Sequence, residues 1–234
     1  DEAKQLLTGV HLRFNDRTLE AAATDGHRLA VLQVEDVLDN DSASDDGPRE
    51  EFAVTLPARS LREVERLVTA WRSEEPVSLF CDRGQVVFLA ADQMVTSRTL
   101  EGTYPSYGQL IPDGFTRTLA LDRRSLIAAL ERIAVLADQH NNVVKFSSQP
   151  EDSVVLISAD AQDVGSGSES LPATLTGDAV QIAFNVRYLL DGLKSMMSDR
   201  VVLHCNAPTT PAVIRSEDET EAFTYLVMPV QIRS

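Results

Sequence analysis

The sequence contains an imperfect internal repeat, and each copy is long enough to be a domain. The segment VSLFCD aligns with VVLHCN, which places Cys81 opposite Cys205, and Pro105 faces Pro229 at the same offset of 124 positions. Solenoid repeats are about 20–50 residues long, whereas whole domains commonly contain about 100–150 residues. The repeat therefore predicts two related domains.

The chain is long enough for two domains, but its first copy is shorter than its second. The 234 residues and the hydrophobic fraction of 43% are sufficient for two separate cores. We expect the first domain and its linker at residues 1–114 and the second domain at residues 115–234. The second copy opens with a strand and a helix, whereas the first starts at Asp1 without that strand and without most of that helix. This difference predicts a fragment that begins inside a domain.

Composition and charge narrow the classes of function. The formal net charge of −15 argues against a uniform nucleic-acid-binding surface, although one basic face is compatible with it. The sequence has no run of about 18 apolar residues and no charged, apolar leader, so we expect a cytoplasmic protein without a membrane partner. Cys81 and Cys205 lie in apolar strand patterns, which predicts small buried side chains rather than a disulfide or a metal site.

Alternating apolar residues predict that short strands dominate the fold. The predicted strands are Val10–Phe14, Leu19–Ala23, Leu29–Val34, Val77–Cys81, Val86–Ala90, Val154–Ser158 and Val201–Cys205. Helical periodicity predicts three helices, at Ala58–Trp71, Arg123–Ala137 and Val186–Met197. Asp122 and Asn185 are the predicted N-caps of the second and third helices. Mobile loops are expected at the acidic residues 37–51 and at Gln162–Ser170, which is rich in glycine and serine.

The three predicted helices carry cations on their polar sides. At about 100° per residue, helical wheels place the following cations away from the apolar sides: Arg59, Arg62, Arg66, Arg124, Arg187 and Lys194. Two interpretations stay open. The cations form an ordinary solvated surface, or equivalent helices of both copies form a face that binds phosphates.

The segment Thr24–Arg28, with the sequence TDGHR, is the sharpest local motif. Its Asp-Gly pair predicts a tight turn after a strand. Asp25 and His27 could belong to a hydrolase, but no serine or cysteine has the context of a nucleophile. The sequence also contains no phosphate-binding loop, dinucleotide-binding loop or histidine-pair metal motif. We therefore predict no catalytic residue, cofactor or metal. A hydrolase would instead lose turnover in a His27→Ala variant.

Four motifs together resemble the bacterial sliding clamp family, the beta subunit of DNA polymerase III. They are TDGHRLAV at Thr24–Val31, EGTYPSY at Glu101–Tyr107, FNVRYLLDGL at Phe184–Leu193 and YLVMPV at Tyr225–Val230. The resemblance covers the whole chain and implies most of the family's second domain and all of its third. It implies an α+β DNA-clamp fold, in which a head-to-tail dimeric ring has helices on its inner face and antiparallel sheets outside. That dimer needs the family's first domain, which is outside this sequence.

The resemblance implies a processivity factor rather than an enzyme. Such a clamp encircles duplex DNA without sequence preference and is nucleoid-associated. Its implied partners are the clamp loader, replicative and translesion DNA polymerases, mismatch-repair proteins and ligase. The alternative is an interaction scaffold of the same fold that does not encircle DNA. Closure of the full-length protein around circular DNA would distinguish the two.

The family's peptide-binding groove lies between its second and third domains and accepts short linear motifs. On one side, the matching positions are Leu7, Thr24, Gly26, His27, Arg28, Leu29, Pro105 and Leu110. On the other side they are Asn185, Tyr188, Pro211, Leu226, Val227, Met228, Pro229 and Val230. Aliphatic walls and a flexible methionine suit Leu or Phe side chains of a peptide. The resemblance also places the subunit interface at Val135 and Leu136.

Overall fold

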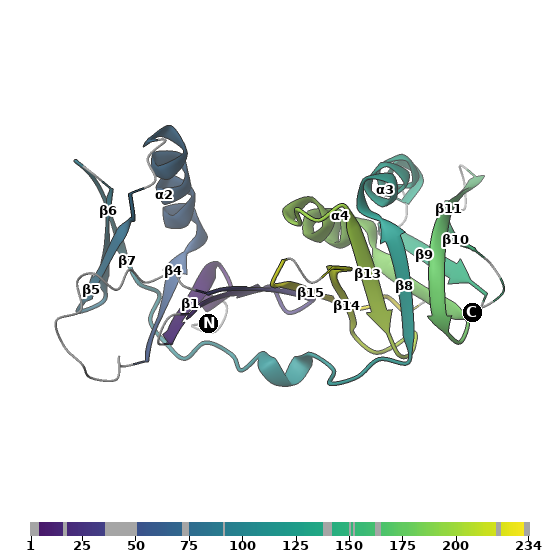
Figure 1. The fold of residues 1–234 in the computed structure, drawn as a ribbon, viewed down its shortest axis with the longest axis horizontal. Coiled ribbons are helices and arrows are strands. Elements are labelled where there is room, and N and C mark those ends of the chain that lie inside the picture. Colours follow the sequence, from purple (N-terminus) through teal and green to yellow (C-terminus); the bar gives the residue numbers. More distant parts are fainter. Residues whose placement is uncertain are drawn as a thin grey trace. The chain divides into compact units, whose positions relative to one another are not determined.

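The computed structural model describes residues 5–15, 18–35, 51–71, 75–90, 92–137, 142–149, 151, 153–161, 165–218 and 221–231 (Figure 1). The chain divides into two compact units, Asp1–Asp25 with Val31–Ser106, and Gly26–Ala30 with Tyr107–Ser234. Each unit combines antiparallel strands with helices, so the predicted α+β class is confirmed. No helix among the described residues is long and apolar enough to cross a membrane.

The first unit contains two groups of strands and one helix. One group has the order β3-β2-β1-β4 and consists of β1 (Gly9–Asn15), β2 (Thr18–Thr24), β3 (Arg28–Val34) and β4 (Phe52–Pro57). The first three residues of β3 belong to the second unit. The other has the order β5-β6-β7, with β5 (Ser78–Asp82), β6 (Gln85–Ala90) and β7 (Gln93–Arg98). Helix α2 (Ala58–Trp71) packs Leu61 and Val64 against a core that includes Leu56 and Phe88. The apolar side of this amphipathic helix therefore joins the two groups of strands.

The second unit is built from eight strands in the order β12-β9-β10-β11-β8-β13-β14-β15. Their bounds are β8 (Arg117–Asp122), β9 (Val143–Ser148), β10 (Val154–Ala161), β11 (Gly165–Gly177), β12 (Val180–Asn185), β13 (Arg200–Cys205), β14 (Ala212–Ser216) and β15 (Phe223–Val227). A 3₁₀ turn, η2 (Gly108–Leu110), precedes them. Helices α3 (Arg123–Ala137) and α4 (Val186–Ser195) lie side by side over the strands (Figure 1). Their apolar sides cover a core that includes Leu130, Phe146, Phe184 and Leu193.

Side-chain caps explain where α3 and α4 begin. The carboxylate of Asp122 accepts a hydrogen bond of 2.7 Å from the backbone N–H of Ser125. The side-chain oxygen of Asn185 accepts one of 2.9 Å from the backbone N–H of Arg187. Each bond satisfies an N–H group that has no partner within the helix, and both predicted caps are confirmed. Helix α4 ends at Ser195, two residues before the predicted end.

The two units repeat one order of elements. The series β4-α2-β5-β6-β7 in the first unit corresponds to β12-α4-β13-β14-β15 in the second. Cys81 and Cys205 occupy corresponding strands, but only Cys205 is buried, so the prediction for Cys81 was wrong. Strand β13 pairs with both β8 and β14, whereas β5 is an edge strand among the described residues. The edge position leaves Cys81 in contact with solvent.

Strand β11 corrects a second expectation. Residues 165–170 were expected in a mobile loop, but they pair antiparallel with β10, and Ala173–Gly177 of the same strand pair with β8. Few of its side chains are buried, so pairing of the backbone rather than an apolar pattern defines this strand. The expected loop residues 162–164, and residues 37–50 of the acidic segment, lie outside the described part of the chain.

Candidate functional site

The last three residues of the TDGHR motif, Gly26–Arg28, are joined to the C-terminal motif within the second unit. Gly26 has a φ of +89°, a conformation that glycine adopts at little cost, and the turn leads into the segment Gly26–Ala30 of that unit. The backbone N–H of Met228 donates a hydrogen bond of 2.9 Å to the carbonyl oxygen of His27. His27 and Met228, which are 201 positions apart in the sequence, therefore lie side by side.

Tyr188 is the centre of a cluster of aromatic and charged groups. The guanidinium carbon of Arg28 lies 4.5 Å from the centroid of the Tyr188 ring. The ring of His27 stacks on Tyr188 at a centroid distance of 6.1 Å. A nitrogen of Arg28 also donates to the carboxylate of Asp191, which is 2.6 Å away. Because Tyr188 and Asp191 are three residues apart on α4, one helix face provides both partners of the arginine.

A residue of β15, Tyr225, holds the backbone of Tyr188 in place. The hydroxyl of Tyr225, a buried residue, donates a hydrogen bond of 2.8 Å to the backbone carbonyl of Tyr188. Gly192 lies on α4 opposite this ring, and a Cβ at that position would lie only 2.3 Å from a ring carbon of Tyr225. The absence of a side chain at Gly192 therefore allows the tyrosine to reach under the helix.

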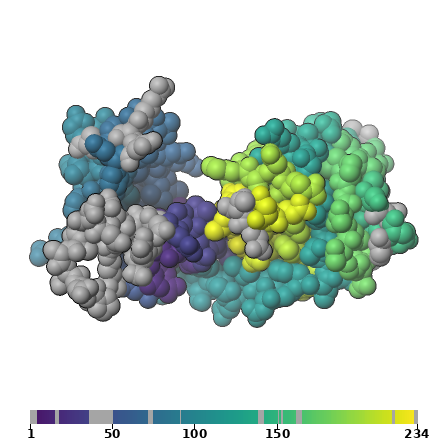
Figure 2. All heavy atoms as spheres, viewed as in Figure 1, coloured from purple at the N-terminus to yellow at the C-terminus, as the bar shows by residue number. Residues whose placement is uncertain are grey.

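The predicted groove residues of the second unit fall into a buried layer and a surface layer. Leu29, Leu226 and Val227 are buried beneath the surface. Met228 is 38% exposed, and the other predicted groove residues of this unit are half-buried or exposed: Gly26, His27, Arg28, Leu110, Asn185, Tyr188, Pro211, Pro229 and Val230. Figure 2 shows part of the C-terminal segment, in yellow, on the surface of this unit. The surface layer combines a flexible thioether with proline, valine and the Arg28–Tyr188 stack.

Three predicted groove residues belong to the first unit. Leu7 and Thr24 are half-buried, and Pro105 is exposed. Their membership of one site with Met228 stays a prediction.

The helix cations are exposed, but several form ion pairs with acidic neighbours. Nζ of Lys194 lies 2.7 Å from a carboxylate oxygen of Glu131, which joins α4 to α3. Two further pairs are Arg124 with Asp199 at 3.4 Å and Arg66 with Glu63 at 2.8 Å. Within the described part of the chain, Arg59 and Arg62 form no such pair and are exposed; Arg187 is exposed as well. The helix cations are therefore partly neutralised by the protein's own carboxylates.

Comparison with known families identifies the two parts of the chain. Residues 1–106 match the central domain of the DNA polymerase III beta subunit, and residues 108–231 match its C-terminal domain. The chain belongs to the DNA polymerase III beta subunit family. The family predicted from the four motifs is thus confirmed.

Relatives in this family support the assignment by sequence and by structure. The beta sliding clamp of Synechococcus elongatus is 51% identical over the whole chain. The solved structure of the Bacillus subtilis DNA polymerase sliding clamp has a TM-score of 0.87 and 27% identity, and it matches 100% of this chain and 59% of its own. A Pseudomonas aeruginosa sliding clamp bound to griselimycin has a TM-score of 0.84 and 25% identity, with 97% of this chain and 58% of its own matched. The chain spans 60% of the length of the Synechococcus relative.

The structure adds a site residue that sequence reasoning did not select. Asp191 accepts a hydrogen bond from Arg28, although the two residues are 163 positions apart. The only feature of the sequence that could have indicated this contact is that both residues belong to family motifs. The residues predicted at a subunit interface, Val135 and Leu136, lie on α3, where Val135 is 71% exposed and Leu136 is half-buried. An exposed valine is compatible with an interface, and the interface stays a prediction.

Proposed function

We propose that this chain supplies the DNA-facing helices and the peptide-binding surface of a sliding clamp that acts as a processivity factor. It would hold polymerases near the primer end by raising their effective concentration there. Its proposed partners are duplex DNA, replicative and translesion DNA polymerases, the clamp loader, mismatch-repair proteins and ligase. Assembly into a head-to-tail dimer would involve Val135 and Leu136 and the family's first domain.

The observation that carries the peptide-binding role is the surface layer around Met228. An exposed methionine next to proline and valine offers an adaptable apolar contact for Leu or Phe side chains. Beside it, His27 and Arg28 are held in place by Tyr188 and Asp191. Apolar anchor positions next to a few fixed polar groups are typical of surfaces that bind short peptides.

The test is the binding of a short apolar peptide to the folded chain. A fluorescent pentapeptide with the sequence Gln, Leu, any residue, Leu, Phe is titrated against the wild type, a Met228→Ala variant and a Met197→Ala variant. Met197 is a matched control because it is 87% exposed and has no place in the proposed site. Loss of an anchor contact is expected to weaken binding about tenfold for Met228→Ala and to leave Met197→Ala unchanged. Equal affinity of all three proteins would contradict the assignment of the site.

The proposed DNA contact is electrostatic and independent of sequence. The helix cations would meet phosphates, so DNA affinity should decrease steeply as salt concentration rises. Because Glu131 neutralises Lys194, the contact of this chain alone is expected to be weak.

The ion pairs on the helices favour one alternative, an interaction scaffold that does not encircle DNA. Retention of the full-length protein on nicked circular DNA, with release after the circle is cut, would support the clamp. Retention that does not depend on circularity would instead support the scaffold.

A further inference from the structure

A surface pocket of about 430 Å³ lies at the end of the candidate site and shares Val230 with it. Its apolar lining consists of Ile182, Ala183, Pro208 and Val230. The volume lies within the range of about 300–1,000 Å³ that is usual for ligand pockets. The pocket belongs entirely to the second unit.

Strands β9 and β12 form the floor of this pocket with the face that points away from the core. Phe184 enters the core, so its neighbour Ala183 points to the opposite face of β12. Lys145 is the direct partner of Ala183 on β9, and cross-strand partners share a face. The side chain of Lys145 therefore lies on the same face of the sheet as the pocket.

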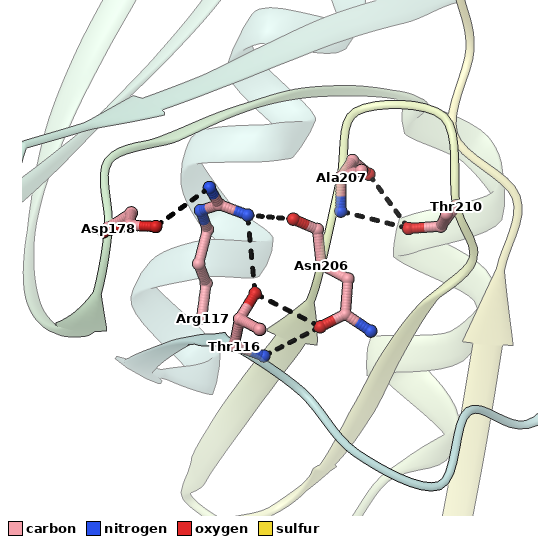
Figure 3. A network of polar contacts seen from close by, with 6 residues as sticks. All are labelled: Thr116, Arg117, Asp178, Asn206, Ala207 and Thr210. Carbon is pink, nitrogen blue, oxygen red and sulfur yellow. Dashed lines mark hydrogen bonds and ion pairs between the residues drawn. The ribbon is translucent and has the colours of Figure 1, made fainter.

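Hydrogen bonds hold both side walls. The backbone N–H of Val230 donates a bond of 2.8 Å to the carbonyl oxygen of Ala183, which fixes the C-terminal wall on β12. The other wall is the loop after β13, which a polar network anchors (Figure 3). There the side-chain oxygen of Asn206 accepts a bond of 2.7 Å from the N–H of Thr116, and Arg117 donates to the Asn206 carbonyl. The pocket is therefore preformed, which lowers the entropic cost of binding.

The polar lining of the pocket contains one charge. The polar residues are Lys145, Gln181, Thr209 and Gln231, and no carboxylate is among the lining residues. Lys145 forms no ion pair with any other residue that the structure describes, in contrast to Lys194. In a protein with a net charge of −15, a pocket with a lysine and no acid selects for an anionic group.

The two sources of such an anionic group are the terminal carboxylate of a peptide and the carboxylate of an acidic side chain. A peptide's terminal carboxylate is usually bound by free backbone N–H groups. Among the residues that line the pocket, Val230 already donates its N–H to the carbonyl oxygen of Ala183, and Pro208 has no N–H to donate. The charged donor of the pocket is the Lys145 ammonium, a point charge on a flexible stem, which suits a side-chain carboxylate.

We propose that this pocket binds an acidic side chain that flanks the apolar motif of a partner peptide, with Lys145 as its counter-ion. The inference rests on the proposed peptide-binding function and adds a charge preference to it. Partners with Glu or Asp beside the apolar motif would bind more tightly than partners with neutral flanks.

The experiment compares peptides that differ only in their flanks. Acetylated and amidated peptides carry the apolar motif with Gln on both sides, with Glu on the amino side or with Glu on the carboxyl side, and a fourth has neutral flanks and a free carboxyl terminus. Each is titrated against the wild type, Lys145→Gln, Lys145→Arg and Arg98→Gln. Arg98 is exposed, lies in the first unit and provides a matched loss of one positive charge.

The expected result is a preference of about threefold to fivefold for one Glu-flanked peptide, the size of an exposed ion pair. This preference should disappear in Lys145→Gln and persist in Lys145→Arg and Arg98→Gln, while the neutral peptide binds all four proteins equally. If the neutral peptide binds but Glu adds nothing, or if the preference survives in Lys145→Gln, the pocket assignment is overturned and the proposed function stands. A preference for the free carboxyl terminus alone also overturns it. If no peptide binds to folded protein, both the function and the inference fail.

Discussion

A single added methyl group at Gly192 should destabilise the second unit, although helix propensity predicts the opposite. Gly192 lies inside α4, where alanine is favoured over glycine by about 1 kcal/mol. In Gly192→Ala, however, the new Cβ would lie 2.3, 2.4 and 2.7 Å from three ring carbons of Tyr225. Ordinary carbon contacts are near 3.5–4.0 Å, so the buried ring or the helix must move by about 1 Å.

The magnitude follows from three contributions. Overpacking of a buried site costs about 1–3 kcal/mol. Displacement of the ring also loses the hydrogen bond from Tyr225 to the Tyr188 carbonyl, which contributes about 1 kcal/mol. The gain of about 1 kcal/mol in helix propensity offsets part of these two costs. The free energy of unfolding should therefore fall by about 1–3 kcal/mol. Because Tyr188 supports Arg28 and His27, peptide affinity should fall as well.

Urea denaturation followed by circular dichroism at 222 nm measures the change. The decisive control is Tyr225→Leu, which removes the ring and leaves space next to Gly192. In that background Gly192→Ala should be stabilising, by about 1 kcal/mol, because only propensity remains. The reasoning is refuted if Gly192→Ala stabilises the wild type, or if its effect has the same sign and size in both backgrounds.

Two further predictions concern the cap of α3 and the cysteines. Asp122→Ala should lower the free energy of unfolding by about 1 kcal/mol, while Asp122→Asn keeps the cap and should change it little, as measured by urea denaturation at pH 7. Hydrogen bonds from the side chain and backbone of Ser125 lower the pKa of Asp122 below its ordinary value of 3.8, so its contribution is present above that pH and is lost as pH falls below it. A wild-type stability that does not exceed that of Asp122→Ala would contradict the cap. Burial raises the pKa of the Cys205 thiol, so at pH 8 an aromatic disulfide reagent should modify Cys81 rapidly and Cys205 only on unfolding. Rapid modification of a Cys81→Ser variant would show that Cys205 is accessible.

Much of the fold could be predicted because its signals are local. The bounds of α2 and α3 follow from apolar periodicity, and the caps at Asp122 and Asn185 follow from residue type next to that pattern. The sequence motifs also identified the family, since they combine turn residues and apolar positions in a fixed order. Strand β11 escaped prediction because its glycine- and serine-rich sequence has no strand pattern, and its partners on β8 and β10 supply the missing hydrogen bonds.

The sequence by itself determined the three helices, the repeat and the family, because each depends on residues that are close together or on motifs that can be matched directly. Only the tertiary structure decided that Arg28 is held by Tyr188 and Asp191, that Lys145 faces a preformed pocket, and that Cys81 is exposed. Each of these outcomes depends on which distant strand or helix becomes a neighbour. Residues that are far apart in the sequence are not brought together by chain connectivity. Their contacts form only when the sheets and helices pack.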